Sequence, residues 1–176
     1  MPVYHVRYTC AADYNARRLP YRPGHLAQLT ALRDEGRVVA GGPEPDGGAA
    51  HIFYRVSDRA ALDRLIAENE FQRAGLFVAH AARGFSDFVE PLERLPHDAG
   101  WKVTLVDGAP TDRARARAAL AKLRSEKLVN LGGFFADGSA LVVVRLADTA
   151  AAVATLEAAG GWDAEHLTAR PWSQTL

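Results

Sequence analysis

The spacing of hydrophobic residues predicts alternating strands and helices along the first half of the chain. Apolar, β-branched stretches indicate strands, leucines three residues apart indicate a helix, and Asp-Gly indicates a hairpin turn. The predicted elements are a strand Val3–Thr9, a helix from Pro23 to Gly36, strands Val38–Gly42 and Ala50–Val56 around a turn at Asp46-Gly47, a helix capped by Asp58, and a strand Phe77–Ala82. The order is therefore βαββαβ.

The second half predicts the same order again. Its elements are a strand Trp101–Val106, a helix Thr111–Glu126, strands Leu128–Phe134 and Ala140–Leu146 around Asp137-Gly138, a helix Thr149–Ala159 and a strand His166–Pro171. Residues 90–100 contain two prolines and charges of both signs. We expect a first domain over residues 1–89, a linker over 90–100 and a second domain over 101–176.

An internal repeat supports this division. When Arg22–Gly47 is aligned with Arg113–Gly138, eleven of 26 positions are identical without a gap. The matches include charged, aliphatic and glycine positions, which low complexity does not explain. The sequence therefore indicates a tandem duplication.

The element order predicts an α+β fold made of two ferredoxin-like βαββαβ units. Helices then cover one face of each antiparallel sheet, and we expect the two sheets to pack face to face as an intrachain, pseudo-dimeric α/β barrel. Strand alternation directs Tyr4, Val6 and Tyr8 toward the helices, with Trp101, Val103 and Leu105 in the corresponding strand. The more polar sets, which include His51, would border either a ligand cavity or a wet interface. Because the second repeat covers the first, a monomer or weak homodimer is expected.

Composition narrows the class of protein. The chain has 176 residues, of which 48% are hydrophobic and 24% charged, as in soluble globular proteins. Lys and Arg total 21, as do Asp and Glu, and no basic stripe predicts nucleic-acid binding. Cys10 is the single cysteine, so no intrachain disulfide forms. No apolar run approaches the length of a membrane span, and the N-terminus does not resemble a signal peptide, which predicts a cytoplasmic protein without a membrane partner.

Three motifs in residues 1–89 resemble the YciI-like (YCII-related) family. They are Arg22-Pro23-Gly24-His25-Leu26-Ala27-Gln28-Leu29, Gly36-Arg37-Val38-Val39-Ala40-Gly41-Gly42-Pro43, and Glu68-Asn69-Glu70-Phe71-Gln72-Arg73-Ala74-Gly75. The resemblance implies the dimeric α/β-barrel superfold and a His-Asp pair at His25 and Asp46. Asn69-Glu70 replaces the family's Asp-Pro, and Ala116 stands where the first repeat has His25. We therefore expect a degenerate second repeat.

Topology also favours a site at His25. If the first helix begins at the edge where the following hairpin turns, His25 and Asp46 share that edge, although 21 residues separate them. A histidine oriented by a carboxylate is a usable general acid/base near neutral pH. Arg22 lies one turn earlier and can hold an anionic substrate, and Glu70 and Phe71 reach the same edge as substrate-binding candidates. The alternative is a structural His25 bonded to the hairpin carboxylate.

A metal site is weakly supported. His5, His51 and His80 lie on strands expected to be neighbours in the order fourth-first-third-second. Three histidines on one face can bind a metal, but His80 is expected on the opposite face, and no metal or organic cofactor is predicted.

These observations predict a small-molecule enzyme that works by proton transfer, of the lyase, isomerase or dehydrochlorinase type. In this hypothesis His25 is the acid/base and Asp46 its orienting group. The alternative is a non-catalytic α/β barrel that binds a small ligand or acts as a scaffold. The residues do not identify a substrate.

Overall fold

The computed structural model describes residues 1–91 and 101–176, and these fold into two compact units. The first unit contains residues 1–84 and 174–176, and the second contains residues 85–91 and 101–173 of the described part. Most of the predicted linker, residues 92–100, lies outside the described residues. The predicted domain boundaries therefore stay a prediction.

The first unit has the predicted βαββαβ order with two additional short helices. Its elements are β1 (Val3–Cys10), α1 (Tyr14–Arg17), α2 (Arg22–Asp34), β2 (Val38–Pro43), β3 (Ala49–Arg55), α3 (Arg59–Glu68), α4 (Glu70–Arg73) and β4 (Phe77–Val89). Asp58 caps α3 as predicted, because its carboxylate accepts a hydrogen bond from the Ala61 amide at 2.8 Å. The sequence pattern did not predict α1 or α4, each of which is a single turn.

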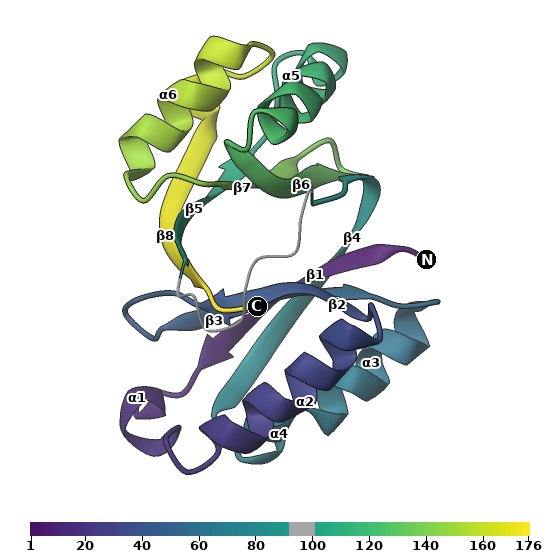
Figure 1. The fold of residues 1–176 in the computed structure, drawn as a ribbon, viewed down its shortest axis with the longest axis vertical. Helices are drawn as coiled ribbons and strands as arrows, with labels where there is room; N and C mark the ends of the chain where they lie inside the picture. Colours follow the sequence, from purple (N-terminus) through teal and green to yellow (C-terminus); the bar gives the residue numbers. More distant parts are fainter. Residues whose placement is uncertain (92–100) are drawn as a thin grey trace. The chain divides into compact units, whose positions relative to one another are not determined.

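The four strands pair in the order β2-β3-β1-β4, as the sequence predicted. All three pairings are antiparallel, and β1 lies between β3 and β4 with Tyr8 opposite Ala50 on one side and His80 on the other. Helices α2, α3 and α4 cover one face of this sheet (Figure 1). Because paired residues point to the same face, the register separates the two faces clearly.

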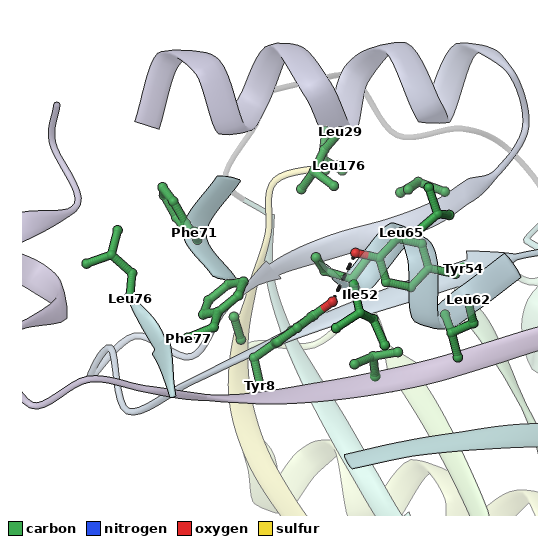
Figure 2. Packing of buried hydrophobic residues seen from close by; sticks show 14 of the residues in the cluster. Tyr8, Leu29, Ile52, Tyr54, Leu62, Leu65, Phe71, Leu76, Phe77 and Leu176 are labelled. Atoms are coloured by element: carbon green, nitrogen blue, oxygen red, sulfur yellow. Dashed lines mark hydrogen bonds between the residues drawn. The ribbon is translucent and has the colours of Figure 1, made fainter. Parts of the chain in front are cut away.

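The helix face carries the core of the first unit. Val6, Tyr8, Ile52 and Tyr54 project from the strands and pack against leucines and isoleucine of α2 and α3. Figure 2 shows Tyr8, Ile52 and Tyr54 in this core, with a hydrogen bond between the two tyrosine hydroxyls, whose oxygens are 3.1 Å apart. This hydrogen bond satisfies two hydroxyls that would otherwise be buried without a partner.

We call the opposite face of this sheet the histidine face. The residues that the register places on it include His5, Arg7, His51, Phe53 and Arg83. Its polar character agrees with the alternation in the sequence.

The second unit repeats the order of the first. It contains the end of β4 and, after it, β5 (Trp101–Gly108), α5 (Arg113–Ser125), β6 (Val129–Phe135), β7 (Ala140–Val144), α6 (Thr149–Ala159), a 3₁₀ turn η1 (Ala164–His166) and β8 (Leu167–Gln174). Strand β4 is longer than predicted, because it continues past Ala82 and pairs with β6 from Phe85 to Val89. Its other strands follow in the order β6-β7-β5-β8.

The predicted orientation of β5 is wrong. Val106, not Leu105, belongs to the hydrophobic core that includes residues of α5 and α6, and it pairs with Val142 of the same core. The middle of β5, from Val103 to Val106, is buried on both faces, so alternation alone did not fix its orientation.

The structure confirms the predicted α+β class with two βαββαβ units. That the units arose by duplication and that their sheets pack face to face both stay predictions. Within the described part of the chain, every helix is too short or too polar to cross a membrane.

Candidate functional site

His25 lies in the first turn of α2 and is almost fully buried, with 7% of its surface exposed. Its ring is stacked on Phe71 with centroids 3.7 Å apart, and Phe77 meets it edge-on at 6.0 Å. The structure therefore brings together two of the predicted site residues, His25 and Phe71. An aromatic stack of this kind fixes the orientation of the imidazole.

The environment of His25 keeps the imidazole neutral. The pKa of His25 is lowered from 6.5 to about 4, mainly because the ring is buried. The Asn69 side chain acts in the opposite direction, and the positive charge of Arg22 acts in the same direction as burial. The ring nitrogen Nδ1 is buried and has no hydrogen-bond partner among the described residues. At neutral pH this histidine is consequently uncharged.

Asn69 links His25 to the tyrosine pair. Its amide interacts electrostatically with both the His25 ring and the Tyr54 hydroxyl, and Tyr54 in turn meets Tyr8. The Asn69 Oδ1 atom accepts a hydrogen bond from the Phe71 amide at 3.0 Å, which starts α4, while Nδ2 is buried without a hydrogen bond of good geometry. Asn69 therefore stands where the sequence-based hypothesis required a carboxylate.

The predicted pairing of His25 with Asp46 is absent from the structure. The Asp46 carboxylate accepts a hydrogen bond from the Gly48 amide at 2.8 Å and stays exposed at the tip of the β2–β3 hairpin. Asp137 does the same in the second unit, where it accepts from the Ser139 amide at 3.0 Å. Asp and Asn commonly bond to their own backbone two residues on, so Asp46 is explained as a turn residue.

The remaining predicted residues lie around the start of α2. The Glu70 carboxylate lies directly against Gly24, where a Cβ atom would collide with it, and the Glu70 amide donates to Gln28 Oε1 at 3.1 Å. Glu70 also lines an open groove of about 640 Å³ whose other lining residues are Tyr21, Gln28, Glu68, Arg73 and Ala74. His25 is not part of this lining. The groove beside the start of α2 therefore does not reach the His25 ring.

A carboxylate–histidine pair exists on the histidine face of the same sheet. His51 Nε2 lies 2.8 Å from Glu44 Oε1, and His51 Nδ1 lies 2.9 Å from His5 Nε2. The exposed fractions of His5 and His51 are 5% and 1%, and the Glu44 side chain is 15% exposed. These three residues form a buried line of hydrogen bonds, which we call the Glu44–His51–His5 relay.

Local structure explains why these three side chains meet. His5 and His51 come from adjacent antiparallel strands, and their rings are nearly parallel with centroids 5.2 Å apart. Glu44 follows the end of β2, and its amide donates to the Ala49 carbonyl across the hairpin at 2.8 Å. The hairpin thus brings Glu44 back toward β3. The sequence placed His5 and His51 on one face, but nothing in it distinguished Glu44 from Asp46 as the partner.

The relay does not have the form of a metal site. His80 pairs with Tyr8 and therefore lies on the helix face, away from His5 and His51. Both nitrogens of His51 are engaged in hydrogen bonds. Among the described residues, no group of three or more His, Cys, Asp or Glu side chains has an arrangement suited to a metal ion.

Comparison with known sequences gives a partial match. A 44-residue stretch is 50% identical to Protein YciI of Escherichia coli O6:H1 and also to Protein YciI of Shigella flexneri. The match covers 22% of this chain and 45% of each relative, so it spans less than half of their length. No profile of a known protein family matches the chain.

Comparison with solved structures supports the fold along the whole chain. A candidate monooxygenase from Lactobacillus acidophilus NCFM is 10% identical with a TM-score of 0.58, covering 99% of this chain and 94% of that protein. Another from Fusobacterium nucleatum subsp. nucleatum is 8% identical with a TM-score of 0.60, and the coverages are 99% and 93%. At these identities the likeness supports the α+β fold alone and says nothing of the chemistry.

Proposed function

We propose that this protein is a small-molecule enzyme that catalyses proton transfer without an organic cofactor, as a lyase, isomerase or dehydrochlorinase does. The observation that carries the proposal is the Glu44–His51–His5 relay, with contacts of 2.8 and 2.9 Å. A carboxylate that orients a histidine is the usual arrangement of a general acid/base. The partial match to Protein YciI and the α/β-barrel fold agree with this proposal.

The relay can accept and return one proton. An ionised carboxylate only accepts hydrogen bonds, so Nε2–H of His51 donates to Glu44, and Nδ1 of neutral His51 accepts from Nε2–H of His5. When a substrate C–H or O–H bond gives its proton to His5 Nδ1, the Nε2 proton of His5 passes to His51 Nδ1. The resulting positive charge on His51 lies beside Glu44, which stabilises it. Reversal of these steps returns the proton to the substrate or to a leaving group.

His25 provides a second candidate centre in this proposal. Its neutral, stacked ring with a buried Nδ1 suits a hydrogen-bond donor or acceptor to a polarised substrate oxygen better than a strong base. Arg22, Glu70 and Phe71 would then contact that substrate, as the sequence predicts. Asp46 has no part in either centre, because its carboxylate is bonded to the Gly48 amide.

Hydrogen–deuterium exchange tests the proposal for any substrate that gives up a carbon-bound proton. The protein is incubated in D₂O with a panel of small keto, lactone and aromatic acids, and loss of C–H signals is followed by proton NMR. We expect catalysed exchange in at least one compound, reduced by about 10²-fold or more in His51→Gln, because acid/base assistance is worth that much.

His25→Gln is the matched control, since it makes the same chemical change on the other face of the sheet. If exchange depends on His25 and not on His51, the reaction takes place at the start of α2. If neither substitution changes a detected exchange, the histidines are structural. A complete absence of exchange across the panel favours the alternative function, a non-catalytic α/β barrel that binds a small ligand.

A further inference from the structure

Positive charge gathers around the relay on the histidine face. Arg7 is opposite His51 in the β1–β3 register, and Arg83 is opposite His5 in the β1–β4 register. Directly opposed residues on one face of a sheet have Cβ atoms about 5 Å apart. The side chain of each arginine therefore leaves the sheet next to that of a histidine. Arg83 takes part in other interactions of the folded chain, as do both histidines.

Arg7 has no carboxylate partner among the described residues. Its Nε is buried without a hydrogen-bond acceptor, and none of the residues that the structure describes forms an ion pair with it. A partly buried guanidinium without an acceptor is unfavourable, because the lost hydration is not replaced. Arg7 therefore places a positive charge beside the relay that no side chain of the described residues neutralises.

The surroundings of Arg7 leave space for a ligand. The register places Ala81 opposite Arg7, and Thr9 and Ala79 form the next pair on the same face. All three of these side chains are small and exposed to solvent. The sheet surface next to Arg7 is therefore open on the side of Thr9 and Ala79.

We propose that Arg7 binds the carboxylate of a small organic acid and holds it beside the Glu44–His51–His5 relay. This inference rests on the proposed function and adds a substrate class to it. A guanidinium offers two parallel N–H donors that match the two oxygens of a planar carboxylate. A singly charged group suits the site better than a dianion, because Glu44 already places a carboxylate at the far end of the relay.

The chemistry of the proposed complex follows from the register. With its carboxylate on Arg7, the acid presents its adjacent carbon toward the imidazoles, because His51 is the direct cross-strand neighbour of Arg7. Removal of a proton from that carbon spreads negative charge onto the carboxylate or a neighbouring carbonyl. Arg7 stabilises this charge while the relay holds the proton. Arg7 is thus a substrate-binding residue in this proposal.

Calorimetric titration with benzoate tests the binding site, and uncharged benzamide of the same shape serves as the control ligand at constant ionic strength. We expect benzoate and not benzamide to bind the wild-type protein, with affinity reduced at least tenfold in Arg7→Gln. Arg7→Lys keeps the positive charge but loses the two parallel N–H donors of the guanidinium, so it should bind benzoate more weakly than the wild type. Arg59→Gln, which removes an exposed arginine paired with Asp63, should bind benzoate as the wild type does.

The outcomes separate this inference from the proposed function. Equal binding of benzoate to wild type and Arg7→Gln, or no binding at all, overturns the carboxylate site. Circular dichroism confirms that each variant is folded, so a lost signal reports the site. If His51→Gln binds benzoate normally while the exchange test shows no catalysis, the carboxylate site stands and the proposed function fails.

Discussion

Glu44 and His51 are joined by a contact of 2.8 Å between Oε1 and Nε2, across the hairpin that connects β2 to β3. The pair is almost excluded from solvent, and His51 also forms a hydrogen bond with His5. A buried charge of this kind is tolerated only when it has polar partners. The hydrogen bonds of the relay therefore hold the end of the hairpin and fix the positions of two imidazoles.

Replacing Asp46 or Asp137 by alanine should have a modest effect. Each carboxylate accepts a hydrogen bond from the amide two residues later, at 2.8 Å for Asp46 and 3.0 Å for Asp137. Asp137 also accepts one from the Ser139 hydroxyl at 2.6 Å, so its loss should cost slightly more. Loss of such a bond at an exposed turn should lower the free energy of unfolding by about 1 kcal/mol. Urea denaturation followed by circular dichroism measures both variants. A much larger loss in Asp46→Ala would show that this carboxylate has a partner beyond its own turn.

Stability should fall when the pH is lowered from 6.5 toward 4, because of His25. Burial lowers the pKa of this histidine to about 4 in the folded chain, against 6.5 as the ordinary value. Between these values the unfolded chain binds more protons, so acid favours unfolding. The free energy of unfolding should decrease by up to about 3 kcal/mol over this interval. Denaturant titrations at several pH values measure the slope.

His25→Gln should remove this part of the pH dependence, whatever its effect on stability at neutral pH. The matched control is His80→Gln, since His80 is an exposed histidine of the same unit. Its slope should equal that of the wild type. If His25→Gln and His80→Gln have the same slope, His25 is not held neutral by burial.

Cys10 should react slowly with thiol reagents. The side chain is 7% exposed, and burial raises the pKa of the thiol to about 11 from 9.0. Only the thiolate attacks, so this shift alone slows the reaction about 100-fold at mildly alkaline pH. Labelling with a disulfide reagent in native buffer and in denaturant measures the ratio of rates. Rapid labelling of the native protein would mean that Cys10 is accessible and ionised.

Much of the fold could be predicted from the sequence, because local patterns determine it. Leucine spacing, Asp-Gly turns and the Asp58 cap each act within a few residues. They predicted the helices and strands of both units to within a few positions, except for the end of β4. The single-turn helices α1 and α4 were missed because they are too short to have a period. The direction of β5 was missed because the middle of this strand is buried on both faces.

The candidate site could be predicted only in part. The pattern placed His5 and His51 on one face and His25 at the start of a helix, as the structure has them. It named Asp46 and not Glu44 as the hairpin carboxylate next to a histidine, because the two are two residues apart and their partners depend on the turn geometry. Asp46 bonds to its own backbone, whereas the longer side chain of Glu44 reaches His51 from the end of β2.

The most direct test of the relay compares these two carboxylates. Glu44→Gln and Asp46→Asn each remove one negative charge and keep the shape of the side chain. If the relay transfers the proton, deuterium exchange into the substrate found by the NMR panel should fall by about 10²-fold in Glu44→Gln and stay near the wild-type rate in Asp46→Asn. A loss of exchange in Asp46→Asn with a normal rate in Glu44→Gln would contradict the relay and return the reaction to the pair predicted from the sequence.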